Sequence, residues 1–166
     1  MPLKIGDLVV HPAFGIGHID EMNEKSFSQQ AMRLYYKVVR LNESMWIRVG
    51  AEEGTGLRLV TAKRDLDYYR DLLKSPPVPL NTNLQQRQLD LISRLTQGSF
   101  QSVCEVMRDL TAWGRREPLD RADTTTLQKT RDSLSQEWAT AAVVSRTEAI
   151  REIDSLLLAT HHAYIG

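Results

Sequence analysis

The alternation of apolar and polar residues changes along the chain and divides it into two parts. In the first 60 residues, apolar positions recur at every second residue, most clearly in the runs Met32–Leu41 and Ser44–Val49. Both runs are rich in residues that favour strands. Short strands with no helical pattern between them predict a small antiparallel sheet that curls into a partial barrel. Asn42-Glu43 is expected to close a hairpin, and Leu57–Val60 to add a last strand.

From Thr61 onward, apolar residues recur at intervals of three and four, which predicts helices. Thr61 is expected to cap the first helix, and the prolines of residues 76–79 to separate it from the second. Further expected boundaries are caps at Asn83, Ser99 and Ser145, a helix end before Gly114, and a helix start at Asp123 or Thr124. The predicted fold class is α+β, with a β-domain at 1–60 and an all-α helical bundle at 61–166.

The glycine pair Gly15-Ile16-Gly17 raises the possibility of a phosphate-binding loop. A dinucleotide fingerprint needs a third glycine where Asp20 stands, and a helix opening there. The residues after the pair alternate like a strand instead. The stretch is therefore interpreted as a turn between two strands, in which glycine supplies backbone angles that other residues disfavour.

Composition narrows the class of protein. Apolar content of 42% is enough for a packed core, and 21 basic residues balance 21 acidic ones. This balance is not that of a stand-alone nucleic-acid binder, so any DNA partner would need a second protein to supply most of the affinity. No apolar run approaches the roughly 18 residues of a membrane span, and the start lacks secretory signal features. We expect a cytoplasmic protein without a membrane partner.

The sequence contains no recognisable catalytic or metal-binding motif. His161 and His162 are adjacent, so on a helix they point about 100° apart and do not form a metal pair. Cys104 lies on an apolar helical stripe, where it is expected to be a buried hydrophobe. No nucleophile, base and orienting group are arranged together. The chain is predicted not to be an enzyme and to need no cofactor, metal or small-molecule substrate.

Several short motifs, in order and at matching spacing over nearly the whole chain, resemble the bacterial CarD family of transcription regulators, also called CdnL. They include Gly6-Asp7-x-Val9-Val10-x-Pro12, Gly98-Ser99-Phe100 and Leu127-x-Lys129-x-Arg131-x-x-Leu134. The resemblance implies a Tudor-like N-terminal domain that docks on the RNA polymerase β subunit. It also implies a helical C-terminal domain that touches promoter DNA at the edge of the transcription bubble, stabilising the open complex.

Lys25, Phe27 and Arg48 fall where the family has polymerase-facing strand residues. An aromatic side chain flanked by cations suits an interface, and the exposed backbone of an edge strand can pair with another sheet. The alternative is that Phe27 belongs to the core and that the two cations solvate the sheet. Spacing alone leaves both open.

The helical half departs from the family at Leu84, which stands where a tryptophan wedge for the minor groove is usual. Glutamines replace most of the neighbouring cations, leaving Arg87, Lys129 and Arg131 as candidates for DNA contact. These three are otherwise ordinary solvated residues. Leu84 is either an exposed wedge or, by its spacing from Leu91, part of the core.

Three hypotheses follow from the sequence. The first is a CarD-like regulator that docks on polymerase and makes a weak, polymerase-dependent contact with promoter DNA. The second is a polymerase-docking module that has lost or weakened the DNA contact. The third, an enzyme using polar residues of the helical half, ranks last.

Overall fold

A computed structural model describes residues 3–27, 29 and 31–164, and the side chains of Glu53 and of residues 160–164 lie outside the description. The chain divides into two compact units, Met1–Val60 and Thr61–Gly166. The first contains, in order, β1 (Leu8–His11), β2 (Gly15–Lys25), β3 (Arg33–Arg40), β4 (Glu43–Arg48), α1 (Glu52–Thr55) and β5 (Arg58–Leu59). Between β2 and β3, Ser28 and Gln30 lie outside the described residues.

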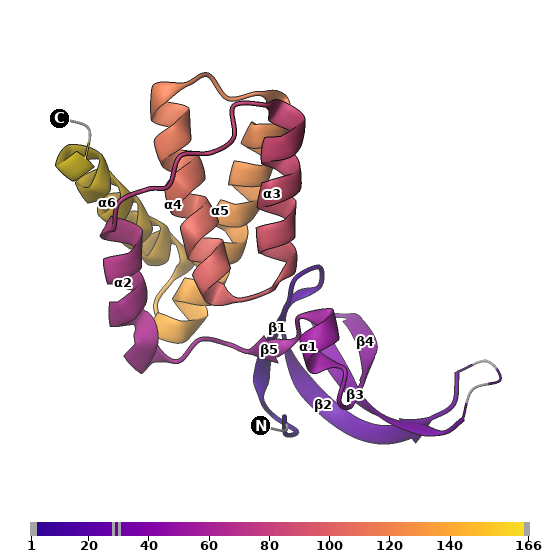
Figure 1. Ribbon diagram of the computed structural model, residues 1–166. Coiled ribbons are helices and arrows are strands. Elements are labelled where there is room, and N and C mark those ends of the chain that lie inside the picture. Colours follow the sequence, from indigo (N-terminus) through magenta and orange to yellow (C-terminus); the bar gives the residue numbers. More distant parts are fainter. Residues whose placement is uncertain (1–2, 28, 30, 165–166) are drawn as a thin grey trace. The chain divides into compact units, whose positions relative to one another are not determined.

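The strands of the first unit form a five-stranded antiparallel sheet in the order β4-β3-β2-β1-β5 (Figure 1). One side of the sheet carries the buried core, which consists of Leu3, Val9, Ile19, Tyr36, Val38, Ile47 and Leu57. Within β3, the buried Tyr36 and Val38 alternate with residues that face the other way. The α+β class and the antiparallel sheet expected from the sequence are confirmed.

Gly15 and Gly17 lie at the start of β2, directly after the turn of residues 12–14 that follows β1. Gly15 has a φ of 88°, which favours glycine. A Cβ on Gly17 would come within 2.7 Å of the Val39 carbonyl oxygen, so only glycine permits the approach of β3. The interpretation as a turn between strands is confirmed, and the glycines serve strand packing.

The second unit contains the 3-10 helix η1 (Lys63–Asp65) and the helices α2 (Leu66–Lys74), α3 (Leu84–Thr96), α4 (Phe100–Arg116), α5 (Arg121–Ala142) and α6 (Arg146–Tyr164). Figure 1 shows α3, α4 and α5 running side by side. Leu91, Val106 and Leu110 form a buried cluster between α3 and α4. Beyond Leu59, the described residues contain no strand, as the helical periodicity predicted. In the described part of the chain, no helix has the length and apolar content to cross a membrane.

The structure bears out some of the expected helix caps. Asn83 accepts a hydrogen bond from the Gln86 N–H, Ser99 from the Ser102 N–H and Ser145 from the Glu148 N–H. These side chains satisfy N–H groups that the first turn of a helix leaves without a partner.

Other predicted boundaries are wrong. Thr61 does not cap a helix, because its N–H and hydroxyl both donate to the Glu137 carboxylate. Helix α4 continues through Gly114 to Arg116, and α5 begins at Arg121 with Asp120 as its N-cap, before the predicted start. The β3–β4 turn is Leu41-Asn42 rather than Asn42-Glu43, since Glu43 pairs with Arg40 across the hairpin.

Candidate interface and helical site

The side of the sheet opposite the core is termed the outer face. It is formed by residues of β2, β3 and β4, namely Glu21, Asn23, Lys25, Arg33, Tyr35, Lys37, Trp46 and Arg48. A β-bulge between Ile19 and Glu21 shifts the register of β2. Without this bulge, Lys25 would share the side of the buried Ile19. The bulge therefore places Lys25 on the outer face.

An aromatic group occupies the middle of the outer face. The Lys25 ammonium nitrogen lies 4.7 Å from the centre of the Trp46 ring, and that of Lys37 lies 6.0 Å from it. Phe27 packs edge-on against Tyr35, with ring centres 4.9 Å apart. Cation–π and edge-to-face contacts of this kind hold the side chains in place. The outer face thus presents ordered aromatic rings among cations.

The three residues predicted to face the polymerase are brought together here. Arg48 pairs with Tyr35 across the ladder, and Tyr35 in turn contacts Phe27, while Lys25 lies over Trp46. Phe27 is 42% exposed, so it lies outside the core. Of the two alternatives for Phe27, its position fits the interface.

Charge on the outer face is strongly one-sided. Lys25, Arg33, Lys37 and Arg48 are opposed only by Glu21, which lies 3.9 Å from Lys37. Four cations against one carboxylate leave an excess of three positive charges on a chain whose formal net charge is zero. The outer face therefore favours an acidic partner.

Strand β4 is an edge of the sheet, because it pairs with β3 alone among the described strands. Its middle residues, Ser44–Ile47, carry no charge and include neither proline nor glycine. Exposed edges are usually protected by charges, prolines or bulges. An edge without such protection along its middle is suited to accept a strand from another protein.

Trp46, Tyr35 and Lys37 belong to this surface but were not identified from the sequence. The signal was present for Trp46, because in a strand it must share a side with Arg48. For Tyr35 and Lys37, the necessary information is the pairing between β3 and β4, which spacing within one run does not reveal.

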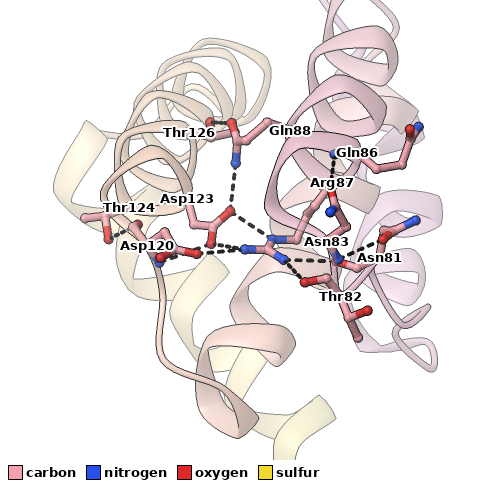
Figure 2. Close-up of polar contacts among 10 residues, drawn as sticks. All are labelled: Asn81, Thr82, Asn83, Gln86, Arg87, Gln88, Asp120, Asp123, Thr124 and Thr126. Carbon is pink, nitrogen blue, oxygen red and sulfur yellow. Dashed lines mark hydrogen bonds and ion pairs between the residues drawn. The ribbon is translucent and has the colours of Figure 1, made fainter.

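In the helical unit, Arg87 is buried, with 4% of its surface exposed. Figure 2 shows its guanidinium reaching from α3 to the start of α5. Five hydrogen bonds engage it, with distances of 2.7 and 3.0 Å to Asp123, 3.1 Å to Asp120, and 2.9 and 3.3 Å to the carbonyl oxygens of Asn81 and Thr82. A guanidinium has five N–H donors. No donor is left for a phosphate, so the predicted DNA contact of Arg87 does not fit this placement.

Asp123 is the completely buried partner of Arg87. It also accepts hydrogen bonds from the Gln88 amide at 2.7 Å and from the Asp120 N–H at 3.1 Å. Burial alone would raise the pKa of Asp123, but the hydrogen bonds from Arg87, the Asp120 backbone and Gln88 hold that pKa below its ordinary value. The network fixes the first turn of α3 against the first turn of α5.

Lys129 and Arg131, the other candidates for DNA contact, lie further along α5. The guanidinium of Arg131 makes two bonds to Asp154 of α6, at 2.6 and 2.7 Å. Lys129 is exposed, but it lies six residues from Asp123, about 240° around the helix from the side that meets α3. The structure therefore does not gather these two residues with Leu84 on one surface.

Leu84 is the first residue of α3 and is 36% exposed, whereas Leu91 is fully buried. Leu84 therefore lies at the rim of the helical unit rather than in its core. Its position allows contact with a partner, and the apolar side chain supplies no charge for that contact.

Within the described residues, no three His, Cys, Asp or Glu side chains cluster as a metal site. The side chains of His161 and His162 lie outside the described residues. Cys104 is buried on α4, as its apolar surroundings predicted.

A curled antiparallel sheet with an aromatic, basic outer face, followed by a helical bundle, defines a two-part interaction protein. Comparison with protein families identifies both parts. Residues 3–58 match the CarD-like/TRCF RID domain, and residues 69–154, which are more than half of the chain, match the CarD C-terminal domain. The chain belongs to the CarD-like family, which consists of non-enzymatic, transcription-associated domains that interact with RNA polymerase.

Proposed function

We propose that this protein is a CarD-like transcription regulator that docks on the RNA polymerase β subunit through its outer face and strand β4. By docking there, it modulates the stability of the open promoter complex. The observation that carries the proposal is the grouping of Lys25, Phe27 and Arg48 around Trp46 and Tyr35, beside an unprotected strand edge.

The chemistry of this surface supports docking to a protein. Aromatic and arginine side chains at the centre of an interface contribute most of the binding free energy. Trp46 and Phe27 supply aromatic area, and Lys25 and Arg48 supply charge on the same side. Strand addition along β4 would provide backbone hydrogen bonds, and the cations would select an acidic partner.

The contact of the helical unit with DNA is proposed to be weak and to depend on docking. Phosphate contacts from free cations dominate affinity for DNA. Near Leu84, the guanidinium of Arg87 is fully engaged, so it contributes no such contact. Leu84 is left as an apolar wedge that polymerase holds beside the promoter.

A second candidate function is a polymerase-docking module without a DNA contact. Two observations favour it, namely the burial of Arg87 and the pairing of Arg131 with Asp154. Both remove candidate phosphate contacts while leaving the outer face unchanged.

The lifetime of an open promoter complex, measured with purified polymerase and its primary sigma factor, tests the proposed function. The wild-type chain is expected to change this lifetime, and Arg48→Glu is expected to abolish the change. Leu84→Trp separates the candidates, because it lengthens the lifetime only if α3 approaches DNA. No effect of the wild-type chain would contradict the proposed function.

A further inference from the structure

Two residues other than glycine have a positive φ among the described residues, Leu41 at 54° and Val143 at 59°. Left-handed backbone is unfavourable for them because Cβ approaches the following carbonyl oxygen. Asparagine and aspartate offset this with a polar side chain, which leucine and valine lack. The backbone conformation at each of these two residues therefore destabilises the folded state.

Burial does not compensate this cost at Leu41. The side chain is 88% exposed, so it gains little from contacts within the chain. Leu41 and Asn42 form the two-residue turn between β3 and β4, where glycine or asparagine is the usual choice. A leucine here is unfavourable both in its backbone and in its exposure to water.

Leu41 adjoins the edge strand proposed to dock on polymerase. It lies in the turn between β3 and β4, two residues before the start of β4, and Arg48 is the last residue of β4. Strand β4 itself spans five residue steps of about 3.3 Å from Glu43 to Arg48, or roughly 17 Å. This is the length of an ordinary strand.

We infer that Leu41 anchors the end of the docking surface, and that the occupant of the edge is an extended segment of the partner running from Arg48 to Leu41. This inference rests on the proposed docking through β4. The segment carries an acidic side chain where it meets Arg48 and an apolar pocket or side chain where it meets Leu41. Burial of Leu41 in the complex compensates for its unfavourable exposure in the free protein.

The test measures the affinity of the full chain for the purified RNA polymerase β subunit, together with its thermal unfolding midpoint. Leu41→Gly relieves the backbone and removes the anchor. It is expected to raise the midpoint by about 2–5 °C and to weaken binding about tenfold. Leu41→Asn, which also tolerates the left-handed backbone, is expected to weaken binding likewise.

Val143→Gly is the matched control, because Val143 has the same backbone conformation, is 80% exposed and lies at the end of α5. It is expected to raise the midpoint without changing the affinity. Unchanged affinity of both Leu41 variants, with binding lost in Arg48→Glu, would overturn the anchor and leave the docking proposal standing. Unchanged affinity in Arg48→Glu as well would overturn the docking proposal itself.

Discussion

The Arg87 guanidinium and the Asp123 carboxylate lie 2.7 Å apart in the interior of the helical unit, and they join α3 to α5. Removing one partner would leave the other as a buried, unpaired charge. Arg87→Met is therefore expected to lower the free energy of unfolding by about 3–5 kcal/mol. Chemical denaturation monitored by circular dichroism measures this change.

Arg131→Met provides the comparison, because the pair of Arg131 and Asp154 is partly exposed to water. Its expected cost is below about 1 kcal/mol. Equal costs for the two substitutions would contradict the structural role assigned to Arg87.

The depressed pKa of Asp123 gives the stability of the protein a dependence on pH. Because its pKa in the folded state lies below the ordinary 3.8, its ion pair stabilises the fold fully above that value. This contribution is lost as pH falls through the folded-state pKa. Asp123→Asn is expected to lower the free energy of unfolding at neutral pH. It is also expected to make this free energy depend less on pH in the acid range. Curves of unfolding free energy against pH that run parallel for the two proteins would exclude this role.

The positions of Leu84 and Leu91 on α3 predict different costs of truncation. Leu91 is fully buried, so Leu91→Ala is expected to cost about 2–5 kcal/mol. Leu84 is 36% exposed, and Leu84→Ala is expected to cost well under that range. Urea denaturation of both variants compares them. A comparable loss at both positions would identify Leu84 as a core residue.

Trp46 is expected to be a binding residue more than a folding residue. Trp46→Ala removes the ring beneath Lys25 and is expected to weaken binding to the β subunit by about tenfold or more. Leu59→Ala is the control, since Leu59 is an exposed apolar residue of β5, at the opposite edge of the sheet. Calorimetric titration of both variants should show a loss of affinity for Trp46→Ala alone. An equal loss of affinity in both variants would argue against a localised interface.

Local signals predicted the two-part fold well. A cap depends on one side chain and the next few N–H groups, so Asn83 and Ser99 were identified from the sequence. The same local reasoning failed at Thr61, whose partner Glu137 is 76 residues away. It also failed at Leu41, because an apolar residue continues a strand pattern and gives no turn signal.

The roles of Lys25 and Arg87 could not be predicted from the sequence for a related reason. The side of the sheet on which Lys25 lies depends on the bulge between Ile19 and Glu21. No residue type in that stretch predicts the bulge. The role of Arg87 depends on Asp123, 36 residues further along the chain. Unless its distant partner is known, a charged residue is predicted from the sequence to be exposed to solvent.

The affinity of the full chain for the RNA polymerase β subunit, compared between wild type and Arg48→Glu, is the sharpest test of docking through the outer face. Lys4→Glu is the matched control, because Lys4 is exposed and belongs neither to the outer face nor to strand β4. Arg48→Glu is expected to weaken binding at least tenfold with little change in thermal stability, since it reverses an exposed charge on the proposed docking surface. Lys4→Glu should bind like the wild type. Equal affinities for wild type and Arg48→Glu would contradict docking through this surface.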